Sequence, residues 1–505
     1  MKNKTFILAI LTCLCACTQI KNEVSDLPDM SSVNKSLEEI LSMIQSITVV
    51  PDYSDGYVNA SYGNDATVDF EIFPLSAAEA LAGNWSGAVS LRAVYTEPAT
   101  KSSHTFVDLP VSYVTYADGI VTVTYNSTGL SAEFWNESAT ANARLLISDG
   151  NNCVASQYYL LRPLLDFSSA TDLSSDESAN SYIVSSVGAY KFKTTKGNST
   201  ESVGNVSSCQ VLWETFGTST APKPGDLIVL AQYEAGNIHF FSSSNKGNAV
   251  IAAKDESGNI LWSWHIWMTD EPQEQVYNNN AGTMMDRNLG ATSATTGDVG
   301  ALGLLYQWGR KDPFLGSSSI SSNTEAMSTI TWPSAVESNN STGTIDYATA
   351  NPTTFITYNG KNHDWYYTGD SSTDDTRWQS SKTIYDPCPV GWRVPDGNSD
   401  GVWATAFGTS SGWTTASNWD STNLGMDFSN TDKTLGSSGP IWYPASGYRD
   451  YSKWSISGVG SYGIYWSVSP YGRGAYRLGF SVNGGVDPAY NSYRAYGQSV
   501  RCLQE

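Results

Sequence analysis

The chain has 505 residues, enough for about three domains of ordinary size, each with its own core. Only 15% of the residues are charged, and 49 acidic against 28 basic residues give a net charge of −21. A field this negative repels polyanions, so the composition argues against binding to nucleic acid. Low charge together with 43 Gly, 29 Tyr and 17 Trp residues is typical of an extracellular β protein.

The first seventeen residues resemble a bacterial lipoprotein signal. Two lysines precede a short apolar run, and the small residue Ala16 stands before Cys17. The run is too short for a permanent transmembrane helix, which needs about 20 apolar residues. We therefore expect residues 1–16 to be a signal peptide and Cys17 to carry the lipid. The resemblance implies a protein anchored in the outer membrane, with its body expected at the cell surface.

A tether and one helix are expected after this anchor. Residues 17–32 are polar and contain a proline, which is typical of a flexible linker. Residues 33–47 have apolar side chains at steps of three and four, which predicts an amphipathic helix. Two heptads are marginal as an isolated helix. This helix either packs on the following domain or forms a short coiled coil that joins two chains.

Residues 48–163 change to a period of two. Apolar and polar residues alternate over 66–73, 89–95, 120–125 and 143–148, between turn signals such as Ala117-Asp-Gly119. Short strands at this spacing predict an immunoglobulin-like β-sandwich.

A second β domain is expected over residues 165–269. Its predicted strands cover 181–184, 189–192, 226–230, 238–241, 249–252 and 260–267. In the last of these strands Trp262 and Trp264 share one face, and large aromatic side chains on one strand face usually belong to a core.

Four cysteines follow the signal: Cys153, Cys209, Cys388 and Cys502. In an oxidising compartment four cysteines permit two disulfides in three pairings, and these residues alone do not choose among them. Neither the cysteines nor the four histidines show the spacing of metal ligands, so we expect no zinc site.

Four unusual strings follow one another in the C-terminal part: Met285–Gly290, Gly303–Phe314, Tyr385–Pro395 and Ser499–Cys502. In sequence and in order they resemble the Fibrobacter succinogenes major paralogous domain. That family occurs in lipoproteins and surface proteins of gut bacteria and is similar in fold to C-type lectins and formylglycine-generating enzymes. The resemblance implies a loop-rich α+β, C-type-lectin-like module over residues 275–505. It also supports a disulfide between Cys388 and Cys502, because lectin-like folds tie their ends together.

No catalytic constellation is evident in the sequence. Formylglycine-generating enzymes work through cysteine chemistry, and the two cysteines of this module are the ones expected to be structural. Arg310, Asp312 and Arg393 stand among prolines and aromatic residues, where such charges usually hold loops together through buried hydrogen bonds. We therefore expect no enzymatic activity.

The segment Asp396–Gly401 matches the opening of a calcium loop, with oxygen-bearing side chains at Asp396, Asn398 and Asp400. The twelfth position is Phe407 rather than the Glu that an EF-hand requires. The segment is either a calcium site of another kind or an ordinary solvated turn.

Two aromatic segments, 442–451 and 465–476, combine tyrosines with Arg and Asp, as ligand-binding loops do. We expect their tryptophans to lie in the core. The ligand-binding residues that we predict are Tyr448, Tyr451, Tyr471, Arg473 and Tyr476.

The whole sequence therefore predicts a mainly β, multidomain, non-catalytic surface lipoprotein. Its expected activity is adhesion, through binding of a glycan or of a surface or matrix protein by the C-terminal module. One alternative is an accessory or tip component of a fimbria-like assembly, and another is an enzyme with the formylglycine-generating fold.

Overall fold

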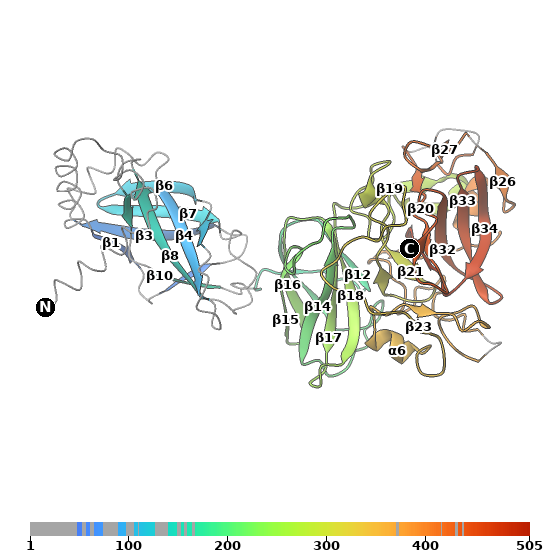
Figure 1. Ribbon diagram of the computed structural model, residues 1–505, viewed down its shortest axis with the longest axis horizontal. Coiled ribbons are helices and arrows are strands. Elements are labelled where there is room, and N and C mark those ends of the chain that lie inside the picture. Colours follow the sequence, from blue (N-terminus) through green and yellow to red (C-terminus); the bar gives the residue numbers. More distant parts are fainter. Residues whose placement is uncertain are drawn as a thin grey trace, which may run out of the picture. The chain divides into compact units, whose positions relative to one another are not determined.

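The computed structural model describes the strands of the N-terminal part and nearly all of the remainder. The described residues are 48–52, 57–60, 65–73, 89–96, 106–109, 111–126, 140–148, 153–155, 159–163, and 167–505 except 370–372, 416, 430–432 and 437–438. They belong to two compact units, Met1–Asp166 and Phe167–Glu505, and both are mainly β as predicted (Figure 1).

Four predictions lie outside these residues, namely the signal peptide over 1–16, the lipidation of Cys17, the tether over 17–32 and the helix over 33–47. Among the residues that are described, no helix has the length and apolar character needed to cross a membrane.

The first unit consists of two β-sheets. One has the strand order β1 (Thr48–Asp52), β3 (Asp65–Phe73), β7 (Ile120–Asn126), β6 (Val111–Ala117). The other has the order β2 (Tyr57–Ala60), β10 (Tyr159–Pro163), β8 (Thr140–Ser148), β4 (Val89–Thr96), β5 (Phe106–Leu109), with β9 (Cys153–Ala155) paired to β8. All pairs are antiparallel except β10 with β2.

This strand order is that of an immunoglobulin domain. The first sheet corresponds to strands A-B-E-D, and the second extends the G-F-C sheet at both edges. Alternate side chains of both sheets are buried, as the period of two predicts. The buried apolar residues are Val68, Phe70, Val121, Val123, Tyr125, Ala143, Leu145 and Leu161.

The predicted turn at Ala117-Asp-Gly119 joins β6 to β7. Asp118 has φ 51° and Gly119 has φ 85°. Two successive residues with positive φ are characteristic of the tight turn that matches the twist of a β-hairpin, and Asp-Gly is favoured there.

The second unit begins with another β-sandwich. One sheet has the order β11 (Thr171–Asp172), β13 (Gly188–Lys193), β16 (Asn237–Ser242), β15 (Ile228–Glu234). The facing sheet has the order β12 (Ser181–Val184), β18 (Ile260–Met268), β17 (Gly247–Lys254), β14 (Ser208–Thr215). Trp262 and Trp264 are buried in the core of this sandwich, as predicted.

Strand β18 is buried on both faces, which joins this sandwich to the C-terminal module. The odd-numbered residues Ser263, His265 and Trp267 face away from the sandwich core and are buried as well. Trp267 belongs to a second core cluster together with Trp308, and its indole N–H donates to the carbonyl oxygen of Ala291 at 2.9 Å. Residues 165–269 and 275–505, predicted as two domains, thus lie in one compact unit that starts at Phe167.

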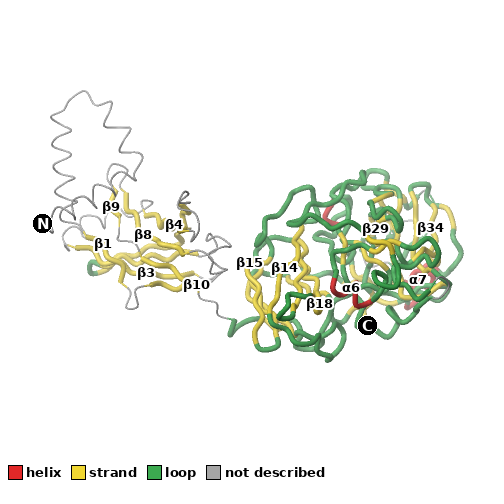
Figure 2. Tube along the Cα trace, turned by 60° about the horizontal axis from the view of Figure 1, so that its bottom comes forward, coloured by secondary structure: helices red, strands yellow, loops and turns green. Residues whose placement is uncertain are grey.

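The rest of this unit is made of short strands and loops, with two helices of six residues each (Figure 2). Its three longest strands lie side by side in one sheet, with a short strand at the edge. The order is β26 (Trp413–Thr414), β34 (Gly485–Tyr493), β33 (Gly474–Ser481), β32 (Tyr462–Tyr471). Two further sheets have the orders β19 (Glu274–Tyr277), β20 (Gly282–Met285), β36 (Leu503–Gln504), β25 (Trp392–Arg393) and β22 (Pro313–Phe314), β21 (Leu305–Gln307), β35 (Gly497–Gln498), β30 (Tyr448–Arg449), β31 (Ile456–Ser457).

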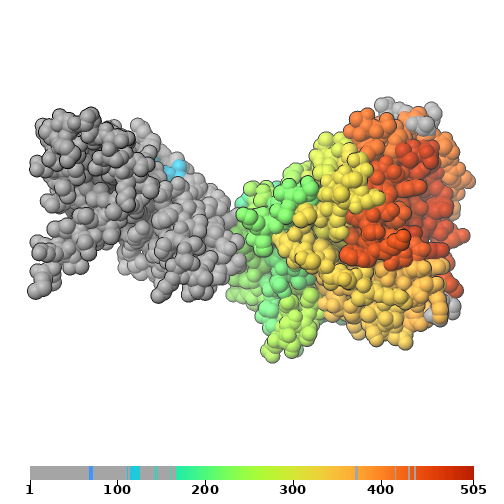
Figure 3. All heavy atoms as spheres, in the orientation of Figure 1, coloured from blue at the N-terminus to red at the C-terminus, as the bar shows by residue number. Residues whose placement is uncertain are grey.

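The remaining elements are small. They are the pair β23 (Val336–Glu337) and β24 (Ile356–Thr357), the sheet β27 (Trp419–Asp420), β28 (Gly425–Asp427), β29 (Trp442–Pro444), the helices α6 (Ile345–Ala350) and α7 (Val402–Phe407), and the 3-10 turns η2 (Asn278–Asn280) and η3 (Val299–Ala301). Segments far apart in the sequence adjoin on the surface of this unit. In Figure 3 the yellow region, near residue 300, lies next to the red C-terminal region.

The expected disulfide between Cys388 and Cys502 is present, and both cysteines are fully buried. Beside it, the carboxylate of Asp386 accepts hydrogen bonds from the backbone N–H groups of Cys388 and Val394, both at 2.9 Å. The carbonyl oxygen of Asp386 accepts from Asn180 of the sandwich at 2.8 Å. Cys209 is a free thiol.

Removing the disulfide is predicted to destabilise the chain. The two cysteines are 114 residues apart, and a link that closes a loop of this length restricts the unfolded chain by about 4 kcal/mol. We expect a Cys388→Ala, Cys502→Ala variant to lose about this much unfolding free energy in urea titrations. The Cys209→Ala variant is the control, and equal losses in the two variants would contradict the prediction.

Buried His265 is predicted to make stability depend on pH. Its Nδ1 lies 2.9 Å from Ser181 Oγ and its Nε2 lies 2.9 Å from Asn248 Oδ1. Burial lowers the pKa of His265 to about 3, whereas an unfolded chain binds this proton near pH 6.5. Between pH 3 and pH 6.5 the unfolded state therefore binds more protons than the folded state. The contribution of neutral His265 to stability is full above pH 6.5 and is lost as the pH falls from 6.5 towards 3.

The neutral variant His265→Gln lacks this dependence. Between pH 7 and pH 4 the wild type is expected to lose about 3 kcal/mol relative to that variant, measured by urea unfolding at each pH. Parallel stability curves for the two proteins would show that the prediction is wrong.

Candidate ligand-binding site

The candidate site rests on a buried pair of arginines that share one carboxylate. Arg377 and Arg494 both form ion pairs with Asp364, and all three side chains are buried. Both guanidinium groups lie against the indole ring of Trp308, with centroid distances of 5.1 and 4.2 Å. Charges held in this way need several partners, because an unpaired buried charge is costly.

Other N–H groups of Arg494 donate to backbone carbonyl oxygens of separate loops. Its Nε donates to Gly474 at 2.9 Å and its Nη1 donates to Asp374 at 2.8 Å. Gly474 belongs to the β32–β33 hairpin, at its tip, where it pairs with Tyr493 of β34. The arginine thereby holds this tip against the end of β34.

Backbone hydrogen bonds join the loops around residues 358–363 and 451 to this end of β34 and to each other. The N–H of Ala495 donates to the carbonyl oxygen of His363 at 3.3 Å, and the N–H of Tyr358 donates to that of Tyr451 at 3.1 Å. At the hairpin tip, Arg473 Nη1 donates to the carbonyl oxygen of Lys361 at 2.8 Å.

Six aromatic rings from these loops form a continuous set of contacts, which we call the tyrosine cluster. The imidazole of His363 stacks on the ring of Tyr493, with centroids 3.7 Å apart and planes within 10°. Tyr451 contacts three rings, with centroid distances of 4.6 to 5.3 Å. The members of the cluster are Tyr358, His363, Tyr448, Tyr451, Tyr493 and Tyr496.

The cluster is firmly seated and yet open to solvent. Tyr358 and Tyr451 pack on a buried group that contains Ile356 and Trp365. Tyr493 is 37% exposed, and the other five rings are half-buried. A rigid aromatic surface with phenol hydroxyl groups at its edge can both stack on a ligand and form hydrogen bonds to it.

Tyr451, Tyr496 and His363 of the cluster are neutral near pH 7. Burial raises the pKa of Tyr451 and Tyr496 above that of an ordinary phenol. Burial, and then the charge of Arg473, lower the pKa of His363. The positive charge of this surface therefore comes from its arginines and lysines rather than from the imidazole.

Of the predicted ligand-binding residues, Tyr448 and Tyr451 belong to this cluster. Tyr471 and Tyr476 instead contact each other on the adjoining hairpin, with centroids 5.0 Å apart, and Arg473 lies between them in the sequence. The tryptophans expected in the core, Trp442 and Trp466, are buried.

Sequence reasoning missed Tyr358, His363, Tyr493 and Tyr496. The string Ser492-Tyr-Arg-Ala-Tyr496 has the same mixture of tyrosine and arginine as the two segments that were singled out, and this signal could have found the last two. Tyr358 and His363 carry no such signal, because they reach the cluster only through tertiary packing.

The predicted calcium residues lie in a turn that leads into α7. The Asp396 carboxylate accepts hydrogen bonds from Arg393 at 2.6 Å and from Ser380, one on each oxygen. Asn398 Oδ1 accepts from the N–H of Asp400 at 2.7 Å. Within the described ranges no three His, Cys, Asp or Glu side chains gather as metal ligands do. Calcium at these residues stays a prediction.

The charges at Arg310 and Asp312 join the sandwich to the module. Asp312 Oδ1 accepts from Ser263 of β18 at 2.7 Å and from the adjacent Lys311 at 2.5 Å. Arg310 donates to the carbonyl oxygen of Thr354 at 2.8 Å. All three charged side chains are buried, and burial lowers the pKa of Lys311. Arg393, which we expected to play a similar part, pairs with Asp396 at a half-buried position.

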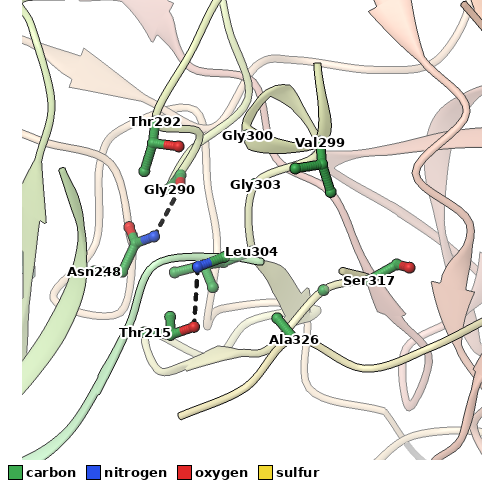
Figure 4. A pocket seen from close by; sticks show the side chains of 12 residues that line it. Thr215, Asn248, Gly290, Thr292, Val299, Gly300, Gly303, Leu304, Ser317 and Ala326 are labelled. Carbon is green, nitrogen blue, oxygen red and sulfur yellow. Dashed lines mark hydrogen bonds between the residues drawn. The ribbon is translucent and has the colours of Figure 1, made fainter. Parts of the chain in front are cut away.

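Two small cavities lie within the described residues of the second unit. The one in Figure 4 lies between the sandwich and residues 290–317, where Asn248 Nδ2 donates to the carbonyl oxygen of Gly290 at 2.9 Å. A second lies beside Arg310 and Tyr385. Each has a volume of about 10 Å³, room for a single water molecule. A ligand larger than water must therefore bind to the surface of this region rather than inside either cavity.

Comparison with known proteins finds no family model that matches the chain and no similar sequence among curated proteins.

Arg494 is predicted to be essential to the framework of the site. The Arg494→Gln variant leaves Asp364 with Arg377 as its one ion-pair partner and frees several carbonyl oxygens, so we expect a loss of about 3 kcal/mol in unfolding free energy. Thermal and urea unfolding would measure it. The exposed neighbour Arg473 is the control, because Arg473→Gln should cost less than about 0.5 kcal/mol. Similar losses in both variants would refute this role.

Proposed function

We propose that this chain is a non-catalytic binding protein of the bacterial cell surface, which holds a saccharide on the tyrosine cluster of its C-terminal module. The observation that carries the proposal is the cluster itself. Three loops that are distant in the sequence bring six aromatic rings into one partly exposed surface, and a buried ion-pair network holds them there.

The chemistry of this surface favours a saccharide over a protein as the ligand. A sugar ring has an apolar face of C–H groups and a rim of hydroxyl groups, which match the faces and the phenol groups of tyrosines. Protein interfaces usually bury about 800 Å² on each partner around an apolar centre. The exposed large hydrophobic side chains of strands β32 to β34 are all tyrosines, namely Tyr462, Tyr471, Tyr490 and Tyr493, and Val482 is exposed in the turn between β33 and β34.

The proposed setting follows from the N-terminal sequence. The signal that ends at Cys17 supports a lipid anchor in the outer membrane, and in the sequence the immunoglobulin-like domain comes between that anchor and the unit that carries the cluster. The four strings in the C-terminal part support membership of the major paralogous domain family, whose members are surface proteins.

Glycan-array binding of the full chain tests this function. We expect saccharide binding that weakens about tenfold or more in Tyr493→Ala and Tyr451→Ala, because each substitution removes a stacking ring. The half-buried Tyr233 on β15 is the matched control, since Tyr233→Ala removes a ring from the sandwich instead.

Two further measurements complete this test. Repeating the array with a chelator examines the calcium prediction, and a parallel array of matrix proteins examines the protein alternative. Binding to no saccharide, or equal loss in all three variants, would overturn the proposed function.

A further inference from the structure

The net charge of the chain is −21, but residues 441–505 contain six basic and three acidic residues. This segment supplies four tyrosines of the cluster and the whole β32–β33 hairpin. Three of its arginines are buried, which leaves Lys453, Arg473 and Arg477 as its less buried cations. Exposed cations beside the cluster attract anions to that place, whereas the acidic remainder of the chain repels them.

Arg473 brings one of these charges to the edge of the cluster. It lies at the exposed tip of the β32–β33 hairpin, close enough to His363 for its charge to lower the pKa of the imidazole. Its Nη1 is fixed by the carbonyl oxygen of Lys361, a neutral acceptor. Among the ion pairs of the described residues, none involves Arg473. The residue as a whole is exposed.

Arg477 provides a second charge on the same hairpin. Its guanidinium lies over the ring of Tyr490, 4.8 Å from the centroid, and its Nε donates to Ser492 Oγ at 2.6 Å. Tyr448 and Tyr496 of the cluster lie within electrostatic reach of it. Tyr490 is 51% exposed, so this charge also sits beside an open aromatic ring.

Two of the three acids of the segment are engaged by their own turns, and the third, Glu505, pairs with Lys382 at 2.9 Å. Asp450 Oδ1 accepts from the N–H groups of Ser452 and Lys453, at 2.9 and 2.8 Å. Asp487 accepts from the N–H of Ala489 at 3.0 Å. Neither carboxylate forms an ion pair with Arg473 or Arg477 in the part of the chain that the structure describes.

We infer that the tyrosine cluster selects an acidic saccharide, one whose carboxylate or sulfate group binds Arg473 while its sugar ring stacks on the cluster. This inference rests on the proposed function and adds the class of ligand to it. Guanidinium groups form paired, charge-assisted hydrogen bonds to carboxylate and sulfate oxygens, and these bonds are stronger than those to neutral hydroxyl groups. The aromatic rings supply the contact area and the arginine supplies the selectivity.

Binding of the full chain to acidic and neutral polysaccharides tests the inference. The probes are polygalacturonate, which carries carboxylates, chondroitin sulfate, which carries both acidic groups, and neutral dextran. We expect at least one acidic polymer to bind more tightly than dextran, and its binding to weaken as salt is raised. Arg473→Gln should weaken that binding about tenfold or more, whereas Arg473→Lys should keep part of it.

A matched variant separates a local contact from a change in net charge. Lys223→Gln removes one positive charge from an exposed position of the sandwich and should leave binding unchanged. Equal binding to dextran and to the acidic polymers, or equal effects of Arg473→Gln and Lys223→Gln, would overturn the inference while leaving saccharide binding in place. Failure of every polymer and of the glycan array would overturn the proposed function as well.

Discussion

Buried arginines are the constraint on which the C-terminal module depends. Its strands are short and its loops long, so backbone ladders alone join few of its segments. Guanidinium groups take the place of backbone ladders, because each has five N–H donors that can reach carbonyl oxygens of different loops. Arg494 joins the β32–β33 tip to residue 374, and Arg449 joins residues 315 and 454. The arginines that are at most 3% exposed are Arg287, Arg310, Arg377, Arg449, Arg494 and Arg501.

Buried side-chain hydrogen bonds also join the sandwich and the module into one unit. Neither face of strand β18 is exposed to solvent, because one face packs in the sandwich core and the other packs against the module. Ser263 on that second face binds Asp312, and Asn180 of the sandwich binds the carbonyl oxygens of residues 384 and 386. The tyrosine cluster is thereby supported by a large single body instead of a small separate domain.

The sequence allowed the strands of both sandwiches to be predicted, because alternation and turn residues are local signals. The Asp118-Gly119 hairpin and the buried Trp262 and Trp264 follow from such signals. The joining of residues 165–269 to the module was not predicted, since a strand buried on both faces differs from a half-buried one only in its tertiary neighbours. For the site, local composition pointed to Tyr448 and Tyr451. Their convergence with Tyr358, His363 and Tyr493 depends on contacts between distant segments, which no local pattern encodes.

We propose that the tyrosine cluster is the surface that holds the ligand. Nitration of tyrosines, followed by mass spectrometry with and without a bound saccharide, tests this proposal. We expect the saccharide to protect Tyr493 and Tyr451 from nitration and to leave the modification of Tyr233 on β15 unchanged. Protection of tyrosines elsewhere, with Tyr493 and Tyr451 modified equally in both states, would contradict it.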